Sequence, residues 1–260
     1  MGSEDQQTVL EESTFENLFK QNRLPSGHSF ELMPDTVETA LRVAEVNDSK
    51  SWKEKALQAY VVCKKIGHFD VQEQGPGFIH NLLDTDVTFL SLAWAAQMNG
   101  TTIGLEEGGV PCPTCSVAFK EVNFGDLKIH CRPTPIGGPD GMFKVDAVSD
   151  AELPNSLQGC TLFVTDPTWQ LAKSKLTDSS WGVPQAVILH RMMCTLRASS
   201  QGGTAPRALS LKGEVNKLKS SVIPKVVQVM NDNIPHFVMQ LDLKCQHCGE
   251  VAVVPFEQAL

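Results

Sequence analysis

The chain has 260 residues, of which 42% are hydrophobic and 20% are charged, and its formal net charge is -8. This composition is ordinary for a globular protein, so we expect a substantial core and exclude a largely disordered chain. Its basic residues form no stripe, which argues against binding to a nucleic-acid backbone as the main activity and favours a protein partner.

The N-terminal segment is acidic and polar. Residues 1–20 lack the basic start and the apolar run of a signal peptide. No window of about 18 consecutive apolar residues occurs in the chain, so we expect no membrane span and a protein that folds in the cytosol. Because residues 1–22 show no clear apolar period, we expect them to form a flexible or docking arm.

Residues 23–100 are expected to form a mainly helical unit. The sequence LPSG at 24–27 is a turn signal. Periodicity and capping residues then predict three helices, at 35–46, 51–65 and 84–98. One face of the first helix is expected to point into the core, and it carries Val37, Leu41 and Ala44.

The character of the sequence changes at residue 101. Residues 101–149 are β-rich and contain a first Cys-x-x-Cys turn and a further strand signal at 143–148, and another strand signal follows this unit at 161–165. Residues 150–234 are expected to be a mainly helical insertion, with helices at 183–196 and 209–219. Residues 235–260 contain a second Cys-x-x-Cys turn and a C-terminal strand. The fold class expected from this order is α+β, with helical segments around a small β-rich unit.

The two Cys-x-x-Cys turns are the strongest chemical signal in the sequence. They contain Cys112 and Cys115, and Cys245 and Cys248, and strand-like sequence flanks each turn. A tight turn of this kind directs two thiolates at one Zn²⁺, and Gly249 supplies the positive φ that the reversing chain needs. Together the pairs predict a complete four-cysteine shell for one structural Zn²⁺ per chain, with no catalytic residue and no organic cofactor.

The spacing between the pairs requires an unusual ribbon. Between Cys115 and Cys245 lie 129 residues, whereas a continuous zinc ribbon places about 15–20 residues between its pairs. We therefore expect a split ribbon, in which residues 150–234 are inserted and the chain returns to complete the metal site. Such an insertion is tolerable because loop-closure entropy grows only logarithmically with length.

Alternatives to a closed zinc site remain. In the first, each pair consists of reduced structural cysteines. In the second, Cys112 and Cys115 form a redox pair, although residues 116–119 look strand-like where a redox motif begins a helix. In the third, the zinc is catalytic; such a site needs an open position, and the nearby candidates to join it are His130, Cys131 and His247. The remaining cysteines, Cys63, Cys160 and Cys194, lie in apolar surroundings and are expected to be small buried side chains.

Four features in this order resemble the baseplate hub and tail-assembly protein family of contractile-tailed bacteriophages. They are LPSG at 24–27, the helical unit after it, VPCPTC with the trailing VNFGDLKI, and the terminal KCQHCGEVAVVPF. The resemblance implies that the four paired cysteines bind zinc and that the protein is a structural or assembly component of the tail baseplate. It also implies other tail or baseplate proteins as partners, assembly in the host cytoplasm, and a place in the virion.

Two other classes of function compete with this interpretation. Zinc ribbons often serve transcription and replication, so a nucleic-acid-binding accessory protein is the main alternative, although few basic residues surround Cys245. An enzyme with a divergent metal site is the other, and it predicts a metal-dependent turnover that changing His130 or Cys131 abolishes.

Overall fold

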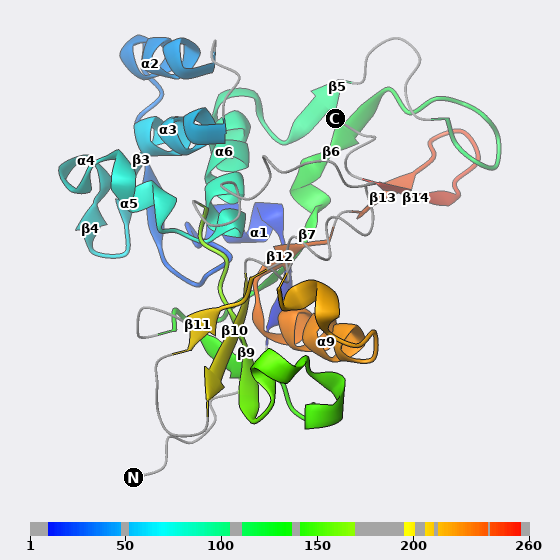
Figure 1. The fold of residues 1–260 in the computed structure, drawn as a ribbon. Helices are drawn as coiled ribbons and strands as arrows, with labels where there is room; N and C mark the ends of the chain where they lie inside the picture. Colours follow the sequence, from blue (N-terminus) through cyan, green and yellow to red (C-terminus); the bar gives the residue numbers. More distant parts are fainter. Residues whose placement is uncertain are drawn as a thin grey trace. The chain divides into compact units, whose positions relative to one another are not determined.

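A computed structural model shows an α+β protein, as expected, with helices beside several small antiparallel sheets (Figure 1). The residues that the structure describes are 10–47, 52–104, 111–136, 141–169, 195–200, 206–210, 213–238 and 240–255. None of the helices within these ranges is long and apolar enough to cross a membrane.

The chain divides into two compact units, each built from segments that are distant in sequence. The unit that we call the ribbon unit comprises Glu11–Pro76, Thr85–Pro135 and Pro235–Leu260. The unit that we call the sheet unit comprises Met1–Leu10, Gly77–Asp84 and Ile136–Ile234. Both Cys-x-x-Cys turns therefore belong to the ribbon unit, and the long segment between them supplies most of the sheet unit.

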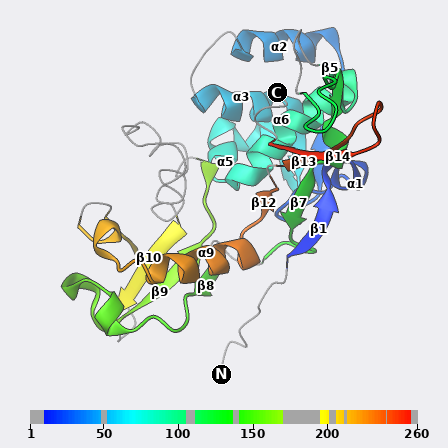
Figure 2. The same ribbon diagram turned by 90° about the vertical axis from the view of Figure 1, so that its right-hand side faces the viewer.

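Residues 11–22 of the expected flexible or docking arm are part of the ribbon unit and form a strand and a helix, so a flexible arm is wrong for these residues. Strand β1 (Glu11–Thr14) pairs with β7 (Lys128–Cys131), and β12 (His236–Phe237) pairs with the other edge of β7 (Figure 2). The Thr14 hydroxyl then caps α1 (Phe15–Lys20) by accepting the Asn17 N–H at 3.3 Å. Phe15 and Leu18 are fully buried, and this burial is what fixes the segment.

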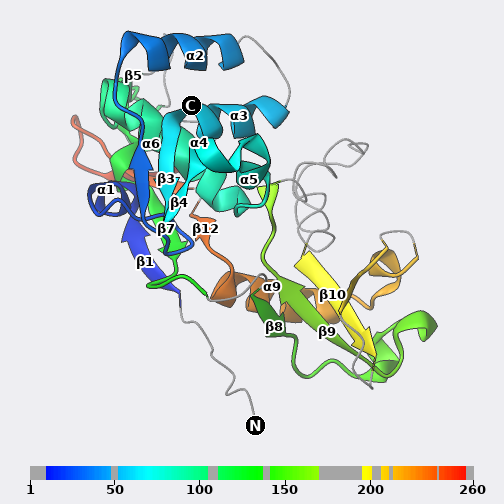
Figure 3. The ribbon, with the colours of Figure 1, turned by 90° about the vertical axis from the view of Figure 1, so that its left-hand side faces the viewer.

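The helical part of the ribbon unit contains α2 (Val37–Asn47), α3 (Trp52–Val62) and α6 (Asp84–Asn99) (Figure 3). The short α4 (Val71–Gln74) follows the three-stranded sheet of β2 (Phe30–Leu32), β3 (Cys63–Ile66) and β4 (Phe69–Asp70), and α5 (Pro76–His80) spans the boundary between the units.

Helix α6 is largely buried, as the sequence predicts. Its Phe89 ring lies 4.9 Å from the ring of Phe15 and 5.8 Å from that of Phe30. The aromatic cluster thus joins the N-terminal segment to the helical part.

The sequence misassigns two features of these helices. Val37, Leu41 and Ala44 are exposed, whereas Val43 is buried, so α2 presents a different face to the core from the one expected. The second expected helix ends at Val62 instead of residue 65, because Cys63–Ile66 pairs as a strand with β2. Pairing within the sheet overrides a helical periodicity that runs on through these residues.

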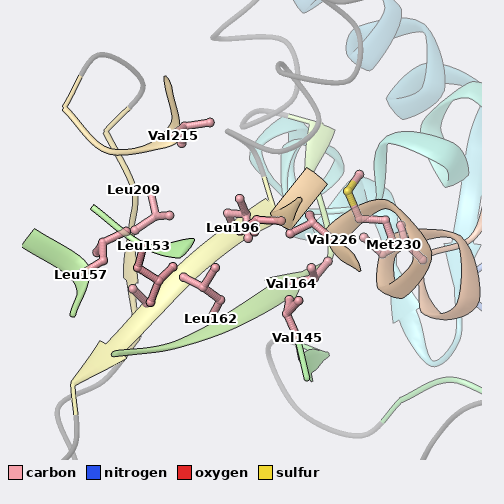
Figure 4. Close-up of a cluster of buried hydrophobic side chains, with 13 residues drawn as sticks. Val145, Leu153, Leu157, Leu162, Val164, Leu196, Leu209, Val215, Val226 and Met230 are labelled. Atoms are coloured by element: carbon pink, nitrogen blue, oxygen red, sulfur yellow. The ribbon is translucent and has the colours of Figure 1, made fainter. Parts of the chain in front are cut away.

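The sheet unit is built on four antiparallel strands in the order β11-β10-β9-β8. Their bounds are β8 Met142–Lys144, β9 Cys160–Thr165, β10 Leu196–Ser200 and β11 Arg207–Ala208. Helix α9 (Val222–Asn233) contributes Val226 and Met230 to the core that the strands form with Leu162 and Val164 (Figure 4). Three single turns of 3-10 helix, Asp150–Glu152, Asn155–Leu157 and Val215–Lys217, complete the described part.

The part of 150–234 that the structure describes contains three strands as well as α9 and three 3-10 turns, so it is a mixed segment there. The expected helix at 209–219 is wrong for the residues that the structure describes, which exclude 211–212. Ser210 instead forms a turn in which its carbonyl accepts the N–H groups of Glu214 and Val215 at 3.0 Å. Most of the expected helix at 183–196 lies outside the described residues, and Leu196 begins β10.

Candidate metal centre

The first cysteine pair lies between the two strands of a small antiparallel sheet. Strand β5 (Thr102–Gly104) pairs with β6 (Glu121–Asn123), and an isolated bridge between Pro111 and Ala118 closes the turn that carries the cysteines. Residues 105–110 lie outside the described part. The pairing brings the chain into a reversal whose tip is the sequence CPTC.

The second pair lies at the tip of a hairpin near the C-terminus. Strand β13 (Gln240–Lys244) pairs with β14 (Val251–Pro255), and Lys244 faces Val251 at the last pair before the turn. The strand sequence QLDLK alternates, with Leu241 and Leu243 buried and its polar residues exposed. This alternation fixes the register, because a slip by one residue would expose both leucines.

The two turns have the same backbone hydrogen bonds. In the first, Cys112 donates its N–H to the Val117 carbonyl at 2.9 Å and accepts the Ser116 N–H at 2.8 Å. In the second, Cys245 donates to the Glu250 carbonyl at 2.8 Å and accepts the Gly249 N–H at 2.9 Å. Each hydrogen bond of the first turn thus has a counterpart at the matching positions of the second. The structure thus contains two copies of one cysteine knuckle.

The residue after the second cysteine is left-handed in both knuckles. Ser116 has φ 62° and Gly249 has φ 77°. Glycine adopts this conformation without steric cost, whereas serine, like other residues with a Cβ, does not. The sequence identifies Gly249 as the reversing residue but misses Ser116, and the only signal available was its equivalent position after Cys115.

The knuckles face one another and bring the four sulfur atoms together. Cys112 Sγ lies 3.7 Å from Cys248 Sγ, and Cys115 Sγ lies 3.6 Å from Cys245 Sγ. All four sulfurs lie within 4.8 Å of one another. Four thiolates about 2.3 Å from a central ion in a tetrahedron are separated by distances of about this size. The cluster therefore has the shape of a four-coordinate metal site, and the expected split ribbon is present.

The first cysteine of each knuckle is prepared to ionise. Backbone N–H groups of Cys248 and His247 hydrogen-bond to the Cys245 sulfur and lower the pKa of that thiol to about 6. In the same way, N–H groups of Cys115 and Thr114 lower the pKa of Cys112. These donors stabilise negative charge on sulfur, which is the form that binds a metal.

Four thiolates together need a cation. The Glu250 N–H lowers the pKa of Cys248, but desolvation and the neighbouring cysteines outweigh it and raise this pKa to about 12. A bound divalent ion would offset the repulsion between the thiolates and hold all four ionised. The chemistry of the cluster thus fits metal binding better than four free thiols.

Burial within the cluster is graded. Cys112 and Cys245 are buried, Cys115 is half-buried and Cys248 is exposed. A metal ion can therefore reach the site from solvent along the second knuckle, while the first cysteine of each knuckle is shielded by the ribbon.

The other residues considered from the sequence lie outside the cluster. His247 is exposed, and the group that could hold a metal ion among the described residues consists of the four cysteines alone. His130 stacks on His236 across β7 and β12, with ring centroids 4.7 Å apart. Cys131 is buried, with its sulfur 3.6 Å from an Arg23 guanidinium nitrogen.

Of the unpaired cysteines, Cys63 is fully buried and hydrogen-bonds to the Lys65 carbonyl at 3.4 Å. Cys160 is half-buried and packs against the core of the sheet unit. Cys194 lies outside the described residues.

Comparison of the chain with protein-family models, with curated proteins and with solved structures gives no significant match.

Proposed function

We propose that the chain is a structural protein whose ribbon unit is held together by one structural Zn²⁺. The observation that carries the proposal is the pair of equivalent knuckles, whose four sulfurs lie within 4.8 Å of one another. Tetrahedral four-sulfur sites select zinc or iron. Zinc is the usual ion where two such knuckles end antiparallel hairpins.

A structural role follows from the number of ligands. Catalytic zinc sites use three protein ligands and keep the fourth position for water or substrate, whereas four cysteines close the coordination shell. Among the described residues, no histidine or carboxylate joins the group. The metal therefore contributes by connecting the hairpin β13–β14 to the segment 111–123, and the protein acts through its surfaces.

The wider role that we propose is assembly through protein-protein contacts, as a component of a bacteriophage tail baseplate. The acidic balance of the chain and the closed cysteine site support an interaction protein. The tail role depends on the sequence resemblance at LPSG and at the two cysteine turns. It places the protein in the virion, with other tail proteins as partners, after assembly in the host cytoplasm.

The residues around the second knuckle make nucleic-acid binding a weaker candidate. The exposed charged residues of the hairpin are Asp242, Lys244 and Glu250, so acidic side chains outnumber basic ones. A phosphate backbone requires the opposite balance. A shift of labelled DNA or RNA that weakens with added salt would overturn this preference.

The test of the metal role is elemental analysis of the purified full chain together with cysteine variants. We expect one zinc per chain, lost in both Cys112→Ser and Cys245→Ser and retained in the control Cys160→Ser. Two ions per chain, zinc retained by either ligand variant, or iron in place of zinc would contradict the proposal.

The tail role has a separate test. Mass spectrometry of purified particles and of tail-assembly intermediates, from a phage that encodes this chain, should detect the protein. Its absence from both would exclude a role in the tail while leaving the metal site intact.

A further inference from the structure

Helix α2 turns an apolar face away from the protein. Val37 is 78% exposed and Leu41 is 60% exposed, and they are the two most exposed large hydrophobic residues in the described part of the chain. With Ala44, which is also exposed, they occupy positions i, i+4 and i+7, which form one stripe on a helix. We call these three residues the outer stripe.

The outer stripe is not left over from incomplete packing of α2. The helix already buries Thr39 and Val43 on its other side, and Val43 belongs to a cluster with Val61, Val62 and Trp94. The figure shows α2 running beside α3 (Figure 3). Helix α2 is already held to the chain by its buried face, so an exposed apolar face adds nothing to the stability of the fold. The outer stripe therefore indicates a contact with another molecule.

The border of the outer stripe is acidic. Asp35 precedes the helix, and Glu38 and Glu45 lie one position after Val37 and Ala44; all three are exposed. The only basic residue of α2 is Arg42, which is half-buried and donates to the Gln72 side chain at 3.5 Å. The surface therefore combines apolar anchors with negative charge and offers no exposed cation.

We propose that the outer stripe of α2 pairs with an amphipathic helix of a partner protein, whose apolar face is flanked by lysine and arginine. Helices commonly pair through apolar anchors at i, i+4 and i+7, and the charges beside these anchors set the choice of partner and the rate of encounter. A second copy of this chain is a poor partner for the outer stripe. Its acidic border would face the same acidic border, and two chains of net charge -8 repel one another. The proposal does not depend on the metal site.

The test uses the full chain and two labelled helical peptides with the same leucine face. Lysines flank this face in one peptide and glutamates flank it in the other. Fluorescence anisotropy should show binding of the lysine peptide, weakening as salt rises, and much weaker binding of the glutamate peptide. Leu41→Gln should weaken binding of the lysine peptide about tenfold, the expected loss when part of a leucine side chain no longer becomes buried.

Two variants control for position and folding. Val253→Gln removes an apolar side chain of nearly equal exposure, 59%, from β14, and it should leave the affinity unchanged. Leu41→Gln should melt at the wild-type temperature, because its side chain contributes little to the core when the helix is free. The double variant Glu38→Gln/Glu45→Gln should keep binding at high salt but lose most of the salt dependence.

Several results would overturn the proposal. Wild-type affinity in Leu41→Gln, an equal loss in Val253→Gln, or equal binding of the two peptides would each contradict it. Light scattering that shows a dimer, converted to monomer by Leu41→Gln, would assign the outer stripe to a second copy instead. Binding to phosphatidylcholine vesicles that requires Leu41 would assign it to a lipid surface.

Discussion

Cys112 Sγ lies 3.7 Å from Cys248 Sγ, although the two cysteines are 136 positions apart along the chain. Their contact joins the middle of the sequence to its C-terminal hairpin, and the intervening chain supplies most of the sheet unit. Closing so long a loop costs conformational entropy, and a metal bound by both knuckles would offset that cost.

Removing the metal should therefore destabilise the ribbon unit. At free zinc 1,000 times above its dissociation constant, binding to the folded state alone contributes about 4 kcal/mol to the free energy of unfolding. A chelator should lower the melting temperature of the wild-type protein to that of Cys245→Ser, and it should not lower that of Cys245→Ser further. A chelator effect of equal size in both proteins would show that the ion is held elsewhere.

The left-handed conformation of Gly249 should make that position sensitive to an added side chain. A Cβ at Gly249 would meet no atom within 4 Å, so Gly249→Ala tests backbone conformation alone. We expect a loss of about 1 kcal/mol in the free energy of unfolding, measured in urea with zinc present. Gly104→Ala is the matched control, because that glycine also has open space around it and lacks a positive φ. Equal losses in the two variants would contradict a conformational role for Gly249.

Gly27, in the LPSG segment, should tolerate no side chain. It has φ 90°, and a Cβ there would lie 2.6 Å from the Thr134 carbonyl carbon and 2.8 Å from the Pro135 nitrogen. Strain and overpacking together predict that Gly27→Ala lowers the free energy of unfolding by about 2–4 kcal/mol. Gly67 also has a positive φ, but a Cβ there would meet only the His28 Nδ1 at 3.7 Å, so Gly67→Ala should lower the free energy of unfolding by less. If the two variants unfold at the same urea concentration, the close approach at Gly27 is not the cause of the stability loss in Gly27→Ala.

Glu152 should make the sheet unit sensitive to acid. Its carboxylate accepts the Ser149 N–H and the Ser221 hydroxyl and pairs with Lys225, and these contacts lower its pKa from 4.5 to about 2. A carboxyl whose pKa is lower in the folded state stabilises the fold above about pH 4.5, and this contribution disappears as the pH falls towards 2.

The difference in stability between wild type and Glu152→Gln should thus be largest near neutral pH and shrink between pH 4.5 and 2, as measured by urea unfolding across that range. A difference that grows on acidification would have the wrong sign. Lys225→Met should cost less stability in the Glu152→Gln background than in the wild type, because only the hydrogen bond from Lys225 to the Ala147 carbonyl is then left to lose.

The four-cysteine cluster could be predicted from the sequence because its signal is local. A Cys-x-x-Cys turn directs both thiolates to one side whatever its distant surroundings, and Gly249 marks the reversal. The meeting of the two pairs over a long insertion followed from counting ligands, since two cysteines cannot close a tetrahedral shell. The role of Ser116 lies in its φ angle, which its residue type does not reveal.

The helical predictions failed where packing between distant segments decides the outcome. Val37, Leu41 and Ala44 form a stripe that periodicity assigns to the core, yet the protein buries the neighbouring face containing Val43. The segment 10–22 has no clear apolar period, but Phe15 contacts Phe89 and Phe124 and, with the buried Leu18, anchors it. Neither contact can be read from a window of adjacent residues.

The most direct test of the shared metal site is X-ray absorption at the zinc edge, recorded on the full chain purified without added metal. The account predicts four sulfur neighbours at about 2.3 Å and no nitrogen or oxygen neighbour. Two sulfurs together with nitrogen or oxygen ligands would show that each knuckle binds separately, and would contradict a ribbon closed by Cys112, Cys115, Cys245 and Cys248.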